Sequence, residues 1–189
     1  YLLEAQDPNG SWKNDPAITS LVLYSFLLPP EYKPEDRTAA ALEKGFDYLE
    51  TFVKRDGGIY DRQFKNYTTA VALLAFTEAH RSEYDPIIHN AKRFLIQFQL
   101  DEGENIDRQH PYYGGIGYGG DDRPDLSNTQ FALDAIKAAE LYQAARGRRP
   151  ANTEPGEHWR KALVFLARTQ NLKAVNDMPY AADDGGFIY

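Results

Sequence analysis

Acidic side chains gathered ahead of a predicted helix are the first candidates for chemistry in this sequence. Asp121 and Asp122 are adjacent, and Asp125 follows on the same segment. Paired aspartates can hold Mg²⁺ and a diphosphate through their carboxylate oxygens. The run lies on a proline-containing loop, which favours a solvated acidic turn ending in an aspartate helix cap. If the segment is catalytic, Asp125 is the best acid candidate, with Asp121 and Asp122 beside it. Ser127 and Asn128 would then orient its carboxyl group.

A glycine-rich insertion upstream of these acids carries three tyrosines, Tyr112, Tyr113 and Tyr118. Aromatic rings suit an isoprenoid chain or a sugar ring, which makes these tyrosines candidate substrate-binding residues. The alternative is that the rings only pack the insertion onto neighbouring helices. No predicted strand precedes the insertion, so its glycines do not indicate a phosphate-binding loop.

The residue types do not support a metal-binding site or thiol chemistry. The chain has no cysteine, which excludes disulfides and thiolate zinc sites within it. The four histidines show no ligand spacing. His110, on the longest insertion, is the most interesting of them, although a loop histidine without a chemical role is favoured. We therefore expect no metal site and no cofactor.

The composition limits which classes of protein this chain can belong to and which partners it can bind. The chain has 189 residues, of which 42% are hydrophobic, enough for one sizeable core. Its net charge of −7 argues against a nucleic-acid partner. No apolar stretch approaches the roughly 20 residues that span a bilayer, so we expect no transmembrane segment. Compartment and oligomeric state stay open.

The elements that would position the candidate residues form a repeat. Each copy begins with an amphipathic segment, continues through a glycine-containing turn and, in the first three copies, enters an Ala- and Leu-rich segment with a threonine near its start. A glutamine ends the amphipathic segment in three copies, as Gln6, Gln99 and Gln170. The copies cover approximately residues 1–33, 38–80, 87–145 and 158–189.

The two segments of each copy predict helices of different kinds. Leu42, Phe46 and Leu49 place apolar side chains on one helical face, and the last copy does the same with Arg168 on its polar face. Residues 70–76 are apolar all round, and a helix of that kind must be covered on every side. The chain is therefore predicted to be all-α and two-layered, with about seven helices and one-sided helices outside. Asp15 is expected to cap the first apolar helix, and Ser127 and Asn128 the third.

This pattern resembles the QW motif of squalene-hopene cyclases and related triterpene cyclases. That motif joins Lys or Arg, Gly or Ala, an aromatic–aliphatic pair, Gln and Gly-x-Trp. Residues 1–12 match its second half, and residues 44–49 and 161–170 match its first half. Residues 114–130 further resemble bacterial prenyltransferase/squalene oxidase repeat proteins, a group largely without assigned function. In such a motif, the glutamines and Trp12 are expected to stabilise the repeat rather than to react.

The resemblance implies an α/α toroid, a double-layered α-barrel closed by about six helix pairs around a central apolar cavity. Residues 1–189 would form one incomplete arc of it, which predicts a piece of a longer protein. The family's Asp-x-Asp-Asp-Thr-Ala acid signature is absent. Aligned on its threonine, the segment from Asp125 to Thr129 keeps the first aspartate and has Ser127 and Asn128 in place of the other two.

Three functions are therefore open. The leading expectation is a cyclase-like protein that binds or cyclises a polyisoprenoid or another small apolar ligand in the cavity. The second is a non-catalytic binding or scaffold protein on the same toroid. The third is a toroidal carbohydrate-active enzyme with carboxylates and tyrosines in a groove.

Overall fold

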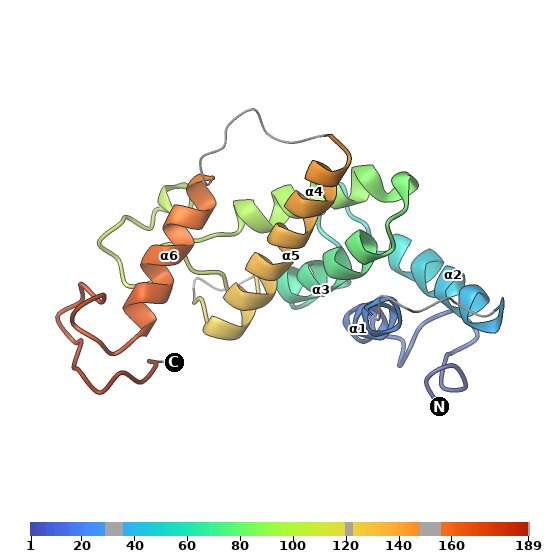
Figure 1. Ribbon diagram of the computed structural model, residues 1–189, viewed down its shortest axis with the longest axis horizontal. Helices are drawn as coiled ribbons and strands as arrows, with labels where there is room; N and C mark the ends of the chain where they lie inside the picture. The colour runs from blue at the N-terminus through green and yellow to red at the C-terminus, as the bar shows by residue number, and fades with distance from the viewer. Residues whose placement is uncertain (29–35, 120–122, 148–155, 189) are drawn as a thin grey trace.

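The computed structural model describes residues 1–28, 36–119, 123–147 and 156–188, and it is all-helical there (Figure 1). Its six α-helices are α1 (Pro16–Leu27), α2 (Asp36–Glu50), α3 (Lys65–Glu78), α4 (Asp85–Gln97), α5 (Leu126–Ala145) and α6 (Glu157–Thr169). Two short 3-10 helices, Ser82–Tyr84 and Glu102–Glu104, join them. The described residues form no strand, only the isolated bridges Val53–Ile59 and Gln170–Phe187. The all-α prediction is confirmed.

The expectation of about seven helices is wrong for the described residues, which hold six. The missing one is the first amphipathic helix. Residues 2–5 form only a turn, in which the amides of Glu4 and Ala5 donate to the carbonyl of Tyr1 at 3.0 Å each. This turn stops before Asp7-Pro8, and a single turn fixes several dihedral angles for very few hydrogen bonds.

The helices form two rows. The inner row consists of α1, α3 and α5, in which α3 packs against α1 on one side and α5 on the other (Figure 1). In the other row, α2 lies against α1, and α4 lies against both α3 and α5. Every side chain of α3 from Thr68 to Thr77 is buried, as its all-round apolar character requires. In α4, by contrast, the buried residues share one face: Ile88, Ala91, Phe94 and Leu95. Helix α3 thus matches the prediction of a covered helix, and α4 matches that of a one-sided helix.

Helix α1 departs from the expectation that an apolar helix is covered on every side. Its buried residues include Thr19 and Leu23, whereas Ile18 and Leu21 are exposed. The reason is that α1 packs chiefly on α3 and α2. Two neighbours cannot surround a helix, so one apolar strip of α1 stays open.

A threonine near the start of each inner helix joins that helix to the turn before it. The hydroxyl of Thr69 accepts from the amide of Ile59 at 2.9 Å and donates to its carbonyl at 3.2 Å. Thr129 makes the same two bonds with Ile116, at 3.0 and 3.1 Å. Because all four residues are buried, one side chain satisfies two backbone groups that water cannot reach.

Glycines in the turns let successive copies approach closely. Gly57 has a φ of +95°, and a Cβ there would lie 2.8 Å from the carbonyl oxygen of Asn90 in the next outer helix. Gly10 and Gly114 have φ values of +90° and +86° and pack still closer to the carbonyls of Lys44 and Lys161. Only glycine combines this backbone conformation with such an approach.

Candidate functional site

The N-terminal ends of the inner helices carry two pockets. The first, which we call the α5–α6 pocket, has a volume of about 480 Å³ and lies between the start of α5 and the C-terminal half of α6. The second, the α1–α3 pocket, has a volume of about 430 Å³ and lies between the starts of α1 and α3. Both pockets therefore lie beside the N-terminal ends of inner-row helices, one at α5 and the other at α1 and α3.

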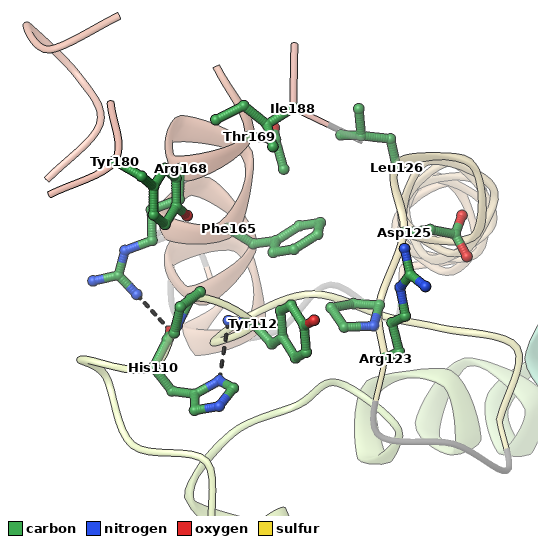
Figure 2. A pocket seen from close by; sticks show the side chains of 12 residues that line it. His110, Tyr112, Arg123, Asp125, Leu126, Phe165, Arg168, Thr169, Tyr180 and Ile188 are labelled. Atoms are coloured by element: carbon green, nitrogen blue, oxygen red, sulfur yellow. Dashed lines mark hydrogen bonds between the residues drawn. The ribbon is translucent and has the colours of Figure 1, made fainter. Parts of the chain in front are cut away.

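The α5–α6 pocket has an apolar floor. Phe165 projects from α6 toward the start of α5, where it faces Tyr112 of the insertion and Leu126 (Figure 2). Ile188 closes one side. Phe165 is held in place because its ring packs on Gly115, where a Cβ would come within 2.9 Å of it. The floor can therefore accept an apolar chain or ring.

Asp125 lines this pocket but serves α5. Its carboxylate accepts from the backbone amide of Asn128 at 2.8 Å and from the side-chain amide of Asn128 at 2.6 Å. Figure 2 shows the carboxylate turned toward α5 and away from Phe165. This is the geometry of an N-cap, so Asp125 matches the capping interpretation. The expectation that Ser127 and Asn128 cap the helix is wrong, because α5 begins at Leu126 and both lie inside its first turn.

Arg168 is the charged residue that sequence reasoning misplaced. It was expected on the polar face of its helix, yet it is only 4% exposed. Its guanidinium group binds both carboxylate oxygens of Asp177, at 2.6 and 2.8 Å, and donates to the carbonyl of His110 at 2.9 Å. The hydrogen bonds from Arg168 hold the pKa of Asp177 below its usual value. Arg168 thus ties the insertion and the C-terminal segment to α6.

His110 has a local structural role at the pocket. Its Nδ1 accepts from the backbone amide of Tyr112 at 3.2 Å, and the two rings lie 5.1 Å apart (Figure 2). The imidazole thereby supports the turn that carries Tyr112 into the pocket.

The three candidate tyrosines do not meet. Tyr112 lines the α5–α6 pocket, whereas its neighbour Tyr113 is buried and donates from its hydroxyl to Glu102 at 2.9 Å. Tyr118 packs on Phe64 beside the start of α3, with ring centroids 4.9 Å apart. Adjacent residues in a turn point in different directions, which a one-dimensional pattern could not reveal.

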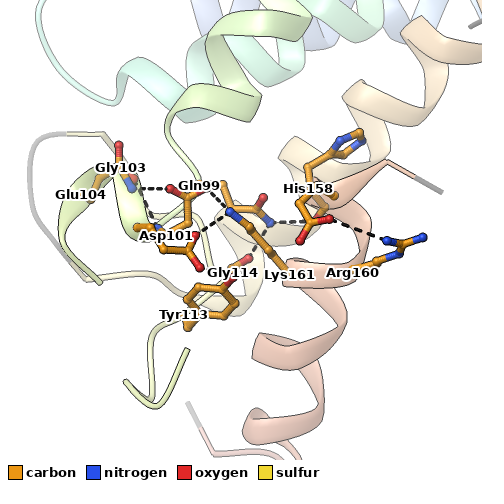
Figure 3. A network of polar contacts seen from close by, with 11 residues as sticks. Gln99, Asp101, Gly103, Glu104, Tyr113, Gly114, His158, Arg160 and Lys161 are labelled. Carbon is orange, nitrogen blue, oxygen red and sulfur yellow. Dashed lines mark hydrogen bonds and ion pairs between the residues drawn. The ribbon is translucent and has the colours of Figure 1, made fainter. Parts of the chain in front are cut away.

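A polar cluster fixes the insertion to α6 (Figure 3). The Lys161 ammonium group binds Asp101 at 2.9 Å and Glu102 at 2.7 Å. The hydrogen bond from Lys161 lowers the pKa of Glu102 to about 2. Beside it, Gln99 donates from Nε2 to the carbonyls of Gly114 and His158 at 2.9 and 3.0 Å. Tyr113 therefore belongs to a structural clamp rather than to a ligand pocket.

The α1–α3 pocket was not anticipated from the sequence. Ile18 and Leu21 of α1 line it together with Phe64 and Tyr67, and the charged residues Asp15, Asp61 and Arg62 also line it. Phe64 has a φ of +53°, in the left-handed region that bulky residues rarely adopt. The sequence signal for it was the all-round apolar character of α1, which two packed neighbours leave partly uncovered.

Other candidate residues contribute less. Asp121 and Asp122 lie outside the described residues. Ser127 is exposed, and Asn128 is buried, with no hydrogen-bond partner for its Oδ1 among the described residues. Within the described ranges, no group of three or more His, Asp or Glu side chains is placed to hold a metal ion.

Comparison with protein-family models, curated proteins and solved structures gives no match. Site assignments for this chain therefore come from its own geometry. Among the described helices, none has the length and apolar character needed to cross a bilayer.

Proposed function

We propose that this chain is part of an α/α toroid of the terpenoid-cyclase type that binds an apolar, isoprenoid-like ligand at its inner rim without supplying a catalytic acid. The alternation of inner and outer helices supports the architecture, as do the repeated glutamine and glycine contacts between successive copies. The apolar floor of the α5–α6 pocket supports the ligand class.

One observation carries the non-catalytic part of the proposal. The carboxylate of Asp125 accepts two hydrogen bonds from Asn128 and points toward α5. Protonating an alkene requires a carboxylic acid aimed at the substrate and held in its acid form. The best acid candidate of this segment is thus arranged for capping.

The test exploits the fact that asparagine caps helices about as well as aspartate. Wild type and Asp125→Asn would be incubated with squalene and with geranylgeranyl diphosphate, and retained and converted material measured by mass spectrometry. We expect the same retention for both proteins and conversion by neither. Conversion by the wild type that the Asp125→Asn variant loses would overturn the non-catalytic reading.

Binding at the α5–α6 pocket has its own variant. Tyr112→Ala removes a ring that lines the pocket and is partly exposed, so retention of squalene should fall several-fold while the fold persists. Tyr1→Ala is the matched control, because Tyr1 is 93% exposed at the far end of the chain. Equal retention by the two variants would place the ligand elsewhere.

A second candidate function has a specific observation behind it. The α1–α3 pocket combines the rings of Phe64 and Tyr67 with the carboxylate of Asp61, and aromatic rings with acids suit a sugar. Asp15 is committed to capping α1 through the amide of Ile18 at 2.9 Å, which leaves Asp61 as the available acid. Oligosaccharide binding that Asp61→Asn abolishes would favour this carbohydrate function over the isoprenoid one.

A further inference from the structure

The α5–α6 pocket carries charged groups beside its apolar floor, and two of them already serve the protein itself. The guanidinium group of Arg168 donates to both carboxylate oxygens of Asp177 and to the carbonyl of His110. The carboxylate of Asp125 accepts from the backbone and side-chain amides of Asn128. Arg168 therefore has its positive charge balanced within the chain, whereas Asp125 leaves a negative charge at the start of α5.

Two hydrogen-bond donors at the pocket have no such partner. Arg123 lines the pocket with an exposed side chain, and it makes no hydrogen bond or ion pair with another described residue. The hydroxyl of Tyr112 makes no hydrogen bond within the described ranges either, and this tyrosine is 37% exposed. Figure 2 shows the hydroxyl turned toward the side of the pocket where Arg123 lies. A cationic donor and a neutral donor thus stand beside the apolar floor, where an anionic acceptor can bind.

The charges around Arg123 limit the charge of that acceptor. Of the two arginines among the described lining residues, Arg168 is already balanced, which leaves Arg123 to meet a ligand. Asp121 and Asp122 precede Arg123 in the sequence, and Asp125 follows it. A phosphate monoester carries a charge of about −1.5 to −2, and a diphosphate carries more, so one cation among three carboxylates offsets either poorly. A carboxylate carries a single charge, and its two oxygens match the planar fork of a guanidinium group.

We propose that the α5–α6 pocket binds an isoprenoid-like chain that ends in a single carboxylate. The apolar chain would lie on the floor formed by Phe165, Leu126 and Ile188. The guanidinium group of Arg123 would donate to both carboxylate oxygens, and the hydroxyl of Tyr112 would donate to one of them. The inference rests on the proposed function, because it names the head group of the apolar ligand that is proposed for this pocket.

The first test keeps the chain of the ligand constant and varies its head group. Farnesoic acid, farnesol and farnesyl diphosphate share one apolar chain and end in a carboxylate, a neutral hydroxyl and a diphosphate. Their dissociation constants for the wild type would be measured at neutral pH by equilibrium dialysis with mass spectrometry, below the concentrations at which they form micelles. We expect farnesoic acid to bind about fivefold more tightly than either of the other two. Equal binding of all three, or a preference for the diphosphate, would overturn the inference.

Substitutions at the two donors locate the preference. Arg123→Gln removes the cation, so it should weaken the binding of farnesoic acid about fivefold and leave that of farnesol unchanged within about twofold. Tyr112→Phe keeps the ring and removes the hydroxyl, and it should weaken the binding of the acid about threefold. Arg55→Gln is the matched control, because Arg55 is also exposed but lines neither pocket. Equal losses for Arg123→Gln and Arg55→Gln would show that only the net charge of the chain acts, which would overturn the inference.

Ionic strength gives a second readout and separates this inference from the proposed function. Raising it from about 0.1 M to about 1 M should reduce the preference for farnesoic acid, because an exposed charge pair is screened, without weakening the binding of farnesol. A preference that is unchanged in high salt would overturn the role of Arg123. Binding of squalene and farnesol without any preference for the acid would overturn the carboxylate head group and leave the proposed apolar ligand in place. Binding of none of these probes would overturn both proposals.

Discussion

Single hydroxyl groups link the two helix rows of this protein. Thr69 is fully buried and satisfies both the amide and the carbonyl of Ile59. Thr69→Val keeps the shape of the side chain but leaves two backbone groups unpaired in the core. We expect it to lower the free energy of unfolding by about 2 kcal/mol, measured by urea denaturation.

Thr77 on the same helix is the control for that substitution. It is also buried, but its hydroxyl donates to the carbonyls of Leu73 and Leu74, which the helix can satisfy without it. Thr77→Val should therefore change the free energy of unfolding by less than about 1 kcal/mol. Similar losses for the two variants would mean that the bonds between Thr69 and Ile59 add nothing specific.

Some residue roles were predictable and others were not, for a physical reason. Gln6 and Gln99 were expected to bond backbone groups at a neighbouring helix end, and each donates to a carbonyl in the N-terminal half of the next outer helix. Arg168 was misplaced because its partner Asp177 lies in an irregular segment whose path has no periodicity. Short-range patterns predict which face a residue occupies, but not an ion pair that a loop brings back to that face.

At the scale of elements, glycine decides how closely consecutive copies pack. Gly57→Ala would place a Cβ 2.8 Å from the carbonyl oxygen of Asn90 at a φ of +95°. Strain in the left-handed region and the displaced helix should together cost about 3 kcal/mol or more. Gly147 is the matched control, since its φ is +71° and nothing among the described atoms lies within 4 Å of its Cβ position. Gly147→Ala should show only the backbone strain of about 1 kcal/mol in urea unfolding.

The clamp between the insertion and α6 should weaken in acid. The hydrogen bond from Lys161 lowers the pKa of Glu102 from 4.5 to about 2 in the folded chain. A lowered carboxyl pKa stabilises the fold above the unfolded value, and this contribution disappears as the pH falls from about 4.5 toward 2. The thermal midpoint of the wild type should therefore fall over that range more than that of Lys161→Met, which has already lost the pair. Parallel curves for the two proteins would contradict the clamp.

Helix type was the most predictable property of the elements, because apolar periodicity depends on neighbours three and four residues apart. The residues at which helices begin and end were less predictable. The start of α4 at Asp85 agrees with its Asp-Pro pair, whereas α5 begins at Leu126, before the expected cap residues. The cap residue is the one whose side chain accepts from the free amides of the first turn, and here Asp125 accepts from the amide of Asn128.

For the whole molecule, the order of layers could be predicted but the pockets could not. An all-round apolar helix must lie inside, and α3 does. The α5–α6 pocket, however, is lined by the insertion, two helix ends and Ile188, which lie far apart in the chain. The position of the pocket depends on the paths of loops of unequal length, and local sequence patterns do not predict those paths.

The two-row arrangement predicts unequal stability along the chain. Helix α3 has neighbours on several sides, while α6 packs only sparsely on α5 and exposes Leu163. In repeat architectures each unit is stabilised mainly by its immediate neighbours, so an end unit can open while the centre stays folded. In native-state hydrogen exchange at low urea, the slowest amides of α3 should exchange with the global free energy of unfolding and with a steep urea dependence. The slowest amides of α6 should exchange at a free energy lower by about 2 kcal/mol or more, with a shallow urea dependence. Identical free energies and slopes for the two helices would instead show that all six described helices unfold as one unit.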